Sequence, residues 1–275
     1  MPEVIMSNQN RHLKQVRKLA RRKTREQEQA FVVEGEDLVL AGLETGARPQ
    51  VLLVDAERVP ELDPALVTCP VLHVEPKLLA EVSGMGHPPR VIGIFELPAP
   101  RDLAVSLDER SVSGATGPWI ALDGIADPGN VGTVLRSAAA FAAGGVIALP
   151  GTADPWGLKA VRASMGACFR TPVVRLDAAG MLLDEELDAV RARMASLRIV
   201  ALDADADVEL RDVPLDPSTV IVIGGERDGL SPQMRAVADV VARIPQQSEV
   251  DSVNAGVAAS IALYEWARAQ RKESR

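Results

Sequence analysis

The feature that most constrains the fold is a set of short apolar runs after residue 118 in which apolar and polar residues do not alternate. The runs are Trp119–Leu122, Val146–Leu149, Ile199–Leu202 and Val220–Ile223, with Val240–Ile244 as a weaker fifth. Strands buried on both faces have this composition, and they form parallel sheets covered by helices. Helical patterns over Val131–Phe141, residues 179–196 and Ala255–Arg268 separate the runs. The pattern predicts an α/β domain over residues 118–275.

A second, smaller α/β domain is predicted for residues 1–97. Its candidate strands are Phe31–Val33, Val51–Val54, Val71–Val74 and Val91–Phe95, and a helix is expected from the turn at residues 34–36 to Leu43. Residues 98–117 are rich in Pro, Ser and Gly and poor in large apolar side chains. We interpret them as a linker between the two domains.

Charge is distributed unevenly along the chain. The net charge is −8, yet the first 25 residues hold eight basic side chains and one acidic side chain. Residues 11–25 predict an amphipathic helix with Leu13, Val16, Leu19 and Ala20 on one face. The opposite face carries Arg11, Lys14, Lys18, Arg21 and Arg25. We predict that this basic stripe contacts RNA phosphates, the alternative being an ordinary solvated helix face.

Other features narrow the class of protein. No apolar run approaches the roughly 20 residues of a membrane span, and the first residues lack a signal-peptide pattern, so we expect a cytoplasmic protein. Cys69 and Cys168 are far apart and outside any C-x-x-C pair, which favours reduced thiols. The three histidines show no metal-ligand spacing, so no metal is expected.

Three segments that follow predicted strands carry the chemical signal. In the first, Pro128 and Gly129 form a turn, Asn130 is placed to cap the next helix, and Arg136 lies nearly two turns later. Exposed N–H groups at such a helix start attract anions. The alternative for Asn130 is that it only caps the helix and has no functional role. The alternative for Arg136 is a surface position or a structural ion pair.

The second segment, Gly224–Ser231, follows a strand directly, and its glycines allow a ligand to approach the backbone. Glu226 is placed to bind a hydroxyl or orient a cation, unless it only adds charge to a helix start capped by Ser231. The third segment has Ile244-Pro245 and then Ser252-Val253-Asn254, which would cap the last helix or bind RNA. No phosphate-binding G-x-x-x-x-G-K-[ST] loop and no G-x-G-x-x-G after a strand are present.

In order and spacing these segments resemble the SpoU/TrmH family of RNA ribose 2′-O-methyltransferases. Asn130 to Arg136 resembles the first motif of that family, Gly224 to Leu230 its G-x-E-x-x-G-L loop, and Ser252-Val253-Asn254 its S-L-N helix start, with Val253 in place of leucine. Residues 10–14, 31–35 and 88–95 are similar to the substrate-binding domain often fused to this family, which resembles a small ribosomal protein fold.

The resemblance implies a deep trefoil knot in the parallel-sheet domain, a homodimer with each site close to the subunit interface, and S-adenosylmethionine (AdoMet) as methyl donor. It implies that Gly224, Ile244 and Val253 contact AdoMet, largely through the backbone. The catalytic candidates that it transfers are Arg136, Asn130, Glu226, Asn254 and Ser252.

The expected function is AdoMet-dependent 2′-O-methylation of RNA, with ribosomal RNA before transfer RNA because of the added N-terminal domain. Arginine stays protonated in proteins, so we expect Arg136 to fix a phosphate and stabilise alkoxide charge rather than act as a base. The alternatives are a non-catalytic RNA-binding member of the fold, an enzyme that methylates a base, and a plain oligomerisation module.

Overall fold

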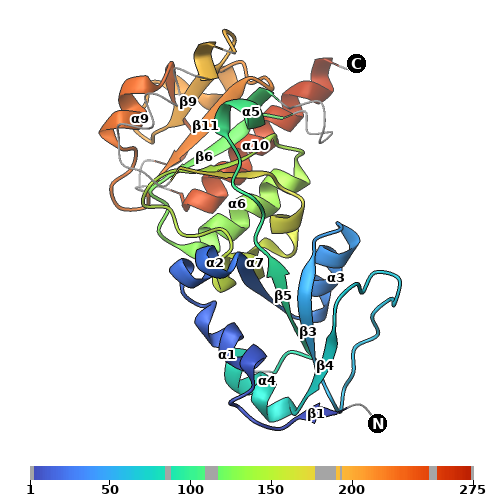
Figure 1. The fold of residues 1–275 in the computed structure, drawn as a ribbon. Coiled ribbons are helices and arrows are strands. Elements are labelled where there is room, and N and C mark those ends of the chain that lie inside the picture. The colour runs from blue at the N-terminus through green and yellow to red at the C-terminus, as the bar shows by residue number, and fades with distance from the viewer. Residues whose placement is uncertain are drawn as a thin grey trace. The chain divides into compact units, whose positions relative to one another are not determined.

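The computed structural model describes residues 3–83, 88–108, 117–176, 190–192, 194–247 and 253–273, with side chains described as far as residue 270. The chain forms two compact units (Figure 1). The first comprises Met1–Ala99 together with Trp156–Arg170, and the second comprises Pro100–Pro155 together with Thr171–Arg275.

The first unit is built on a mixed sheet with the strand order β1-β4-β3-β5-β2. The strands are β1 (Val4–Ile5), β2 (Ala30–Glu34), β3 (Pro49–Asp55), β4 (Val71–Val74) and β5 (Val91–Glu96). β5 runs antiparallel to both β2 and β3, whereas β4 is parallel to β1 and β3. Helices α3 (Glu36–Glu44) and α4 (Pro76–Ser83) complete its α/β pattern. The four predicted strands and the helix ending near Leu43 are confirmed.

The basic N-terminal segment forms two helices, α1 (Arg11–Lys18) and α2 (Arg22–Glu28), instead of one. The break falls at Arg21, whose backbone is extended. The prediction that Arg25 lies on the exposed stripe is wrong, since this residue is only 5% exposed. Its guanidinium donates to the carbonyl oxygens of Leu19 (2.7 Å) and Ala20 (3.0 Å), because carbonyls at a helix end lack partners within the helix.

Residues 156–170, which lie within the range predicted for the C-terminal domain, pack as part of the first unit. They contain α7 (Leu158–Ser164) and the short 3₁₀ helix η1 (Ala167–Phe169). The Phe169 ring lies 5.8 Å from that of Phe31 and 5.3 Å from that of Phe95. Arg162 forms an ion pair with Glu34, whose side chain is fully buried. No pattern in the sequence indicated that this segment would pack with the first unit.

The second unit holds a sheet with the order β10-β12-β9-β11-β6-β7-β8. Its strands are β6 (Trp119–Asp123), β7 (Gly145–Ala148), β8 (Val173–Arg175), β9 (Arg198–Leu202), β10 (Val208–Glu209), β11 (Thr219–Gly224) and β12 (Val240–Arg243). Every neighbouring pair is parallel. The predicted parallel sheet is therefore confirmed.

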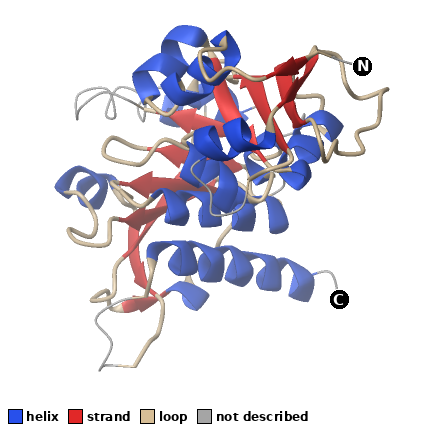
Figure 2. Ribbon diagram, turned by 90° about the horizontal axis from the view of Figure 1, so that it is seen from below, coloured by secondary structure: helices blue, strands red, loops and turns tan. Residues whose placement is uncertain are grey.

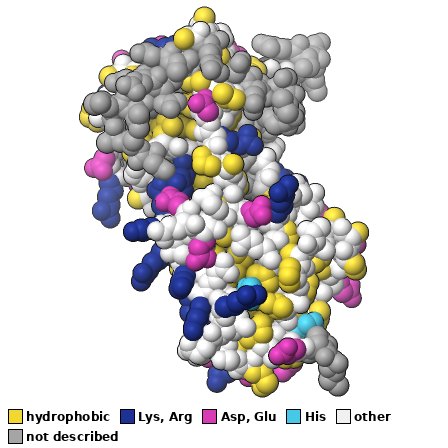
Figure 3. Space-filling view, in the orientation of Figure 1, with side chains coloured by type: hydrophobic (Ala, Val, Ile, Leu, Met, Phe, Trp, Pro, Cys, Tyr) yellow, Lys and Arg dark blue, Asp and Glu magenta, His cyan; other side chains and the backbone are white. Residues whose placement is uncertain are grey.

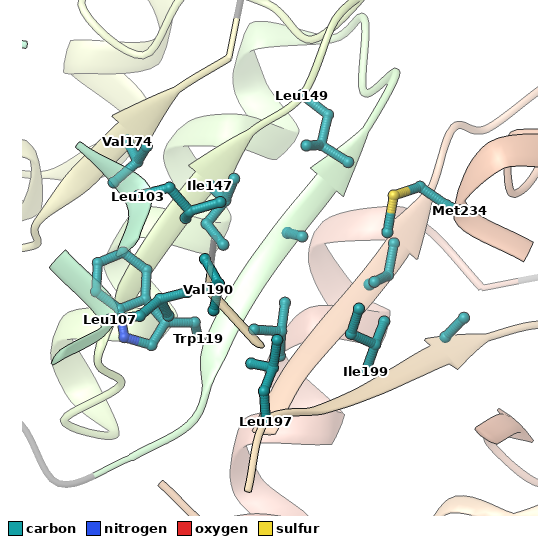
Figure 4. Close-up of a cluster of buried hydrophobic side chains, with 14 of the residues drawn as sticks. Leu103, Leu107, Trp119, Ile147, Leu149, Val174, Val190, Leu197, Ile199 and Met234 are labelled. Carbon is teal, nitrogen blue, oxygen red and sulfur yellow. The ribbon is translucent and has the colours of Figure 1, made fainter. Parts of the chain in front are cut away.

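Helices lie on both sides of these strands (Figure 2). α6 (Pro128–Ala140) packs against α10 (Ala255–Glu273), where the hydroxyls of Ser137 and Ser260 are 2.7 Å apart. α5 (Leu103–Asp108) and α9 (Pro232–Val237) contribute to a separate apolar cluster with Trp119 (Figure 4). This double cover explains why the strands lack polar alternation.

Part of the expected linker belongs to that cluster. Leu103 and Leu107 are 2% and 1% exposed, and Figure 4 shows them beside Trp119 and Val190. Their spacing of four residues places both on one face of α5, so even a short helix buries them together. Most of the helix predicted over residues 179–196 lies outside the described residues, although residues 190–192 are helical.

Candidate active site

The three candidate segments meet because four neighbouring strands end at the same edge of the parallel sheet. In the register of the sheet, Asp123 of β6 pairs with Gly224 of β11. Ile223 pairs with Leu202 of β9, which in turn pairs with Ala242 of β12. The segments that follow these strands must therefore emerge side by side, at the edge where parallel α/β sheets bind ligands.

Asp127, and not Asn130, caps helix α6. The Asp127 carboxylate accepts from the Gly129 amide (2.8 Å), and the helix begins at Pro128. Asn130 therefore lies within the first turn and is 7% exposed, which corrects its predicted role as the cap. Its side chain is thereby available for contacts with the other two segments.

Those contacts form a line of hydrogen bonds through Asn254, Asn130 and Glu226. The Asn254 Oδ1 atom accepts from the amides of Gly256 (2.9 Å) and Val257 (3.2 Å) at the start of α10. The Asn254 Nδ2 atom then donates to Asn130 Oδ1 (2.9 Å), and Asn130 Nδ2 donates to the Glu226 carboxylate. Because backbone amides can only donate, the helix start orients both amide side chains and requires an acceptor at residue 226.

The loop of residues 224–231 is closely folded. The amides of Gly225 and Gly229 each donate to the carbonyl of the other (2.9 Å). A Cβ atom on Gly224 would lie 2.4 Å from the carbonyl carbon of Gly229, so only glycine fits there. Ser231 caps α9 by accepting from the Met234 amide (3.2 Å), which confirms Ser231 as the helix cap, whereas Glu226 accepts from Asn130.

One residue at this edge was absent from the sequence-based candidates. Asp123, which is 8% exposed, accepts from the Ser231 amide through its Oδ2 atom (2.6 Å). A polar residue that ends an otherwise apolar strand was the only available signal.

A cavity of about 410 Å³ opens against this loop. Gly224, Ile244 and Val253, the three predicted cofactor contacts, all line it, as does Glu226. Other lining residues supply apolar walls, namely Leu202, Ile223, Leu230, Ala255 and Ala258. The volume is in the range of small-molecule sites. The lining also includes charged and polar side chains, namely those of Asp203, Asp205, Arg227, Asp228, Arg235 and Gln246.

Arg136 stands apart from this cavity. It is exposed on α6 and does not line the cavity, and its side chain makes no hydrogen bond or ion pair with any residue that the structure describes. The structure thus brings together Asn130, Glu226 and Asn254 but leaves the Arg136 guanidinium available to an external anion. Ser252 lies outside the described residues.

In the first unit, a second cavity of about 390 Å³ coincides with the basic stripe. It is lined by Arg11, His12, Lys14, Gln15, Lys18 and Glu28. Figure 3 shows Lys and Arg side chains in a row over this part of the unit. Burial and the adjacent Arg11 cation lower the pKa of His12, so its imidazole is neutral at pH 7 and accepts from Arg11 Nε (3.0 Å). Of the predicted stripe, Arg11, Lys14, Lys18 and Arg21 are exposed and supply positive charge at this surface.

Other chemistry finds less support in the part of the chain that the structure describes. Burial raises the pKa of both Cys69 and Cys168, which keeps these thiols protonated and weakly reactive. No group of three or more His, Cys, Asp or Glu side chains there is arranged to hold a metal ion. No described helix is both long and apolar enough to cross a membrane.

Fold and site together define a parallel α/β protein with a small-molecule cavity where its strands end, and comparison with known proteins identifies the family. Residues 118–264 match the SpoU rRNA Methylase family, and residues 10–93 match the MRM3-like substrate binding domain. The chain therefore belongs to the SpoU methylase family and carries a substrate-binding domain at its N-terminal side. Membership implies the trefoil knot predicted from the sequence.

Solved structures extend the likeness over nearly the whole chain. A SpoU methyltransferase from Streptomyces viridochromogenes in complex with AdoMet has a TM-score of 0.82 and 31% identity, covering 97% of this chain and 100% of that one. An AdoMet-bound rRNA methyltransferase from Sinorhizobium meliloti has a TM-score of 0.80 and 30% identity, covering 98% of each chain.

Curated relatives fall into two groups. A 23S rRNA (uridine(2479)-2′-O)-methyltransferase of Streptomyces viridochromogenes is 30% identical, with 91% of this chain and 86% of the relative covered. An uncharacterized tRNA/rRNA methyltransferase of Mycolicibacterium smegmatis is 39% identical over 152 residues, which is 55% of this chain and 46% of that relative. The chain thus spans about half the length of relatives of the second kind.

Proposed function

We propose that the protein transfers a methyl group from AdoMet to a ribose 2′-hydroxyl of RNA, with ribosomal RNA as the substrate. The observation that carries the proposal is the convergence of the three segments. Residues 224–230, Ile244 and Val253 line one cavity, and Asn130, Glu226 and Asn254 are hydrogen-bonded beside it. Two relatives with this fold bind AdoMet.

The cavity suits AdoMet in size, and it combines apolar walls with charged and polar groups. When bound, AdoMet supplies an electrophilic methyl group on a sulfonium sulfur. The backbones of Gly224, Ile244 and Val253 hold it. Because Gly224 has no side chain, the backbone of Gly229 and Leu230 can pack directly against it and form the wall of the cavity. A backbone role is consistent with valine in place of leucine at residue 253.

Arg136 binds the RNA phosphate beside the reacting ribose and stabilises the negative charge that develops on its 2′-oxygen. This role requires a guanidinium without a protein partner, as the described residues leave it. The hydroxyl proton leaves to phosphate or to water, because arginine does not deprotonate under ordinary conditions. The chain Asn254–Asn130–Glu226 holds the surrounding segments in register so that the two substrates are aligned.

The first unit provides a second contact surface for the RNA. Arg11, Lys14, Lys18 and Arg21 contact its phosphates. Ribosomal RNA is favoured because the relative that aligns over 91% of the chain is named for a 23S rRNA modification. We further propose that the protein works in the cytoplasm and that it is a homodimer. Sedimentation equilibrium would test the homodimer directly.

An Arg136→Ala variant should bind AdoMet normally, measured by calorimetry, yet lose at least about 100-fold in methylation rate, on the scale of removing one charge-stabilising group. Arg136→Lys should also be poor, because lysine cannot reproduce bidentate phosphate binding. Arg48→Ala, at an exposed position of the first unit, serves as control. Wild-type methylation by Arg136→Ala would refute the assignment.

The RNA is identified by mapping alkali-resistant linkages in cells with and without the protein, because 2′-O-methylation blocks alkaline cleavage. Alkali resistance that depends on the protein and appears in ribosomal RNA supports the proposal. If it appears in transfer RNA instead, transfer RNA is the substrate. Methylated bases without alkali resistance would point to base methylation. A wild-type protein that binds RNA but not AdoMet would be a non-catalytic member of the fold.

A further inference from the structure

Asp123 touches both ends of the loop that walls the cofactor cavity. Its backbone pairs with Gly224, where the loop begins. Its carboxylate accepts from the amide of Ser231, where the loop ends and α9 is capped. Asp123, at the end of β6, therefore contacts both ends of the loop that follows β11.

The contact is also close along the backbone. A Cβ atom on Gly225 would lie 2.9 Å from the carbonyl oxygen of Gly124, the residue after Asp123. The base of the loop thus rests directly on the end of β6. Between its ends, the loop is crossed by the paired hydrogen bonds of Gly225 and Gly229. Residues 224–230 all line the cavity, whereas Asp123 does not.

We propose that Asp123 is a positioning residue for the cofactor: its carboxylate clasps the loop of residues 224–231 and preforms the wall that AdoMet meets. The inference rests on the proposed function, since it names a residue that acts on the same cavity. A loop with free ends loses conformational freedom when a ligand binds, and a loop already closed does not. Asp123 thus contributes to AdoMet affinity without contact with AdoMet.

The experiment compares Asp123→Ala and Asp123→Asn with the wild type and with Asp216→Ala. Asp216 is a matched control because its carboxylate accepts from the Ser218 amide (2.7 Å) just before β11 begins, at the end of that strand opposite Gly224. Its loss removes a carboxylate that accepts from a backbone amide, and from the hydroxyls of Ser218 and Thr219, beside the same strand. Asp216 does not line the cavity. Asp123→Asn retains an oxygen that can accept from Ser231.

Two measurements are made on each folded protein. Amide hydrogen exchange without ligand should accelerate about tenfold or more at Ser231, Gly225 and Gly229 in Asp123→Ala, the equivalent of one hydrogen bond to a charged acceptor. Calorimetry should show AdoMet binding weakened by about tenfold on the same scale. Asp123→Asn should recover most of both, and Asp216→Ala should change neither.

The inference is overturned if Gly225 and Gly229 keep wild-type protection in Asp123→Ala, or if Asp216→Ala weakens AdoMet binding equally. Should Asp123→Ala fail to fold, unchanged AdoMet affinity together with unchanged loop exchange in a milder Asp123→Ser variant would overturn it as well. A wild-type protein that binds no AdoMet refutes the proposed function instead, while the exchange measurement still decides whether Asp123 closes the loop.

Discussion

At the scale of single residues, the direction of the hydrogen bonds beside the cavity follows from chemistry alone. The helix start that Asn254 caps offers only donors, so Asn254 must present its oxygen there and its nitrogen to Asn130. Asn130 in turn presents its nitrogen to Glu226. Each amide uses both ends, and a carboxylate completes the chain. This network is satisfied only when all three segments are in place.

The direction of that network can be tested by reversing its last bond. Asn130→Asp places two carboxylates together and should lower the free energy of unfolding by about 1–3 kcal/mol, the cost of an unsatisfied polar group. Adding Glu226→Gln supplies an amide donor to Asp at 130 and should restore most of the loss. Urea unfolding of the two single variants and the double variant gives the coupling energy. Additive effects would contradict the network.

At the scale of elements, the α7–η1 segment shows that sequence neighbours need not share a core. Phe169 packs on Phe31 and Phe95, and Arg162 pairs with buried Glu34. Arg162 also donates to the carbonyl oxygen of Ser83 (2.9 Å). The segment therefore supplies both an aromatic ring and a counter-charge that the first unit needs. Chain segments before and after it belong to the second unit.

The ion pair gives a pH-dependent prediction. Burial raises the pKa of Glu34, and Arg162 partly offsets this. A carboxyl whose pKa is higher in the folded state stabilises the fold fully at low pH and loses that contribution as pH rises through the folded pKa. Arg162→Leu removes the counter-charge, so unfolding free energy should fall by about 3 kcal/mol at pH 8 and by less at pH 5.

The control for that prediction lies in the same segment. Arg170 pairs with Glu44 at 3.5 Å, and both side chains are about half exposed. Arg170→Leu should therefore change the unfolding free energy by less than about 1 kcal/mol at either pH. Urea unfolding at both pH values measures each variant. A loss in Arg162→Leu that does not depend on pH would show that packing, and not the Glu34 charge, determines its effect.

At the scale of the whole molecule, our proposal requires an acidic protein to bind a polyanion through one local surface. The net charge is −8, but the exposed cations of α1 and the residue that precedes α2 are gathered on the first unit. On this proposal attraction is strongest at that surface, because the remainder of the chain carries a net negative charge. Binding should consequently be strongly dependent on salt.

Replacing Lys14 and Lys18 together by alanine should weaken RNA binding and reduce the slope of log affinity against log salt by about 1–2, as expected for two lost phosphate contacts. Arg48→Ala, which removes an exposed cation outside the stripe, should leave the slope nearly unchanged. Filter binding over a range of salt concentrations measures both. An unaltered slope in the double variant would mean that other residues bind the phosphates.

The sequence by itself determined the parallel sheet, most of its strands and the three segments of the site, because apolar runs and turn residues act locally. It did not reveal the capping by Asp127, the burial of Arg25 or the hydrogen bond from Ser231 to Asp123. Nor did it reveal that residues 156–170 pack with the first unit. These depend on which groups from distant segments come within hydrogen-bonding or packing distance. Only the tertiary structure decides that, since strand order and register set which chain ends become neighbours.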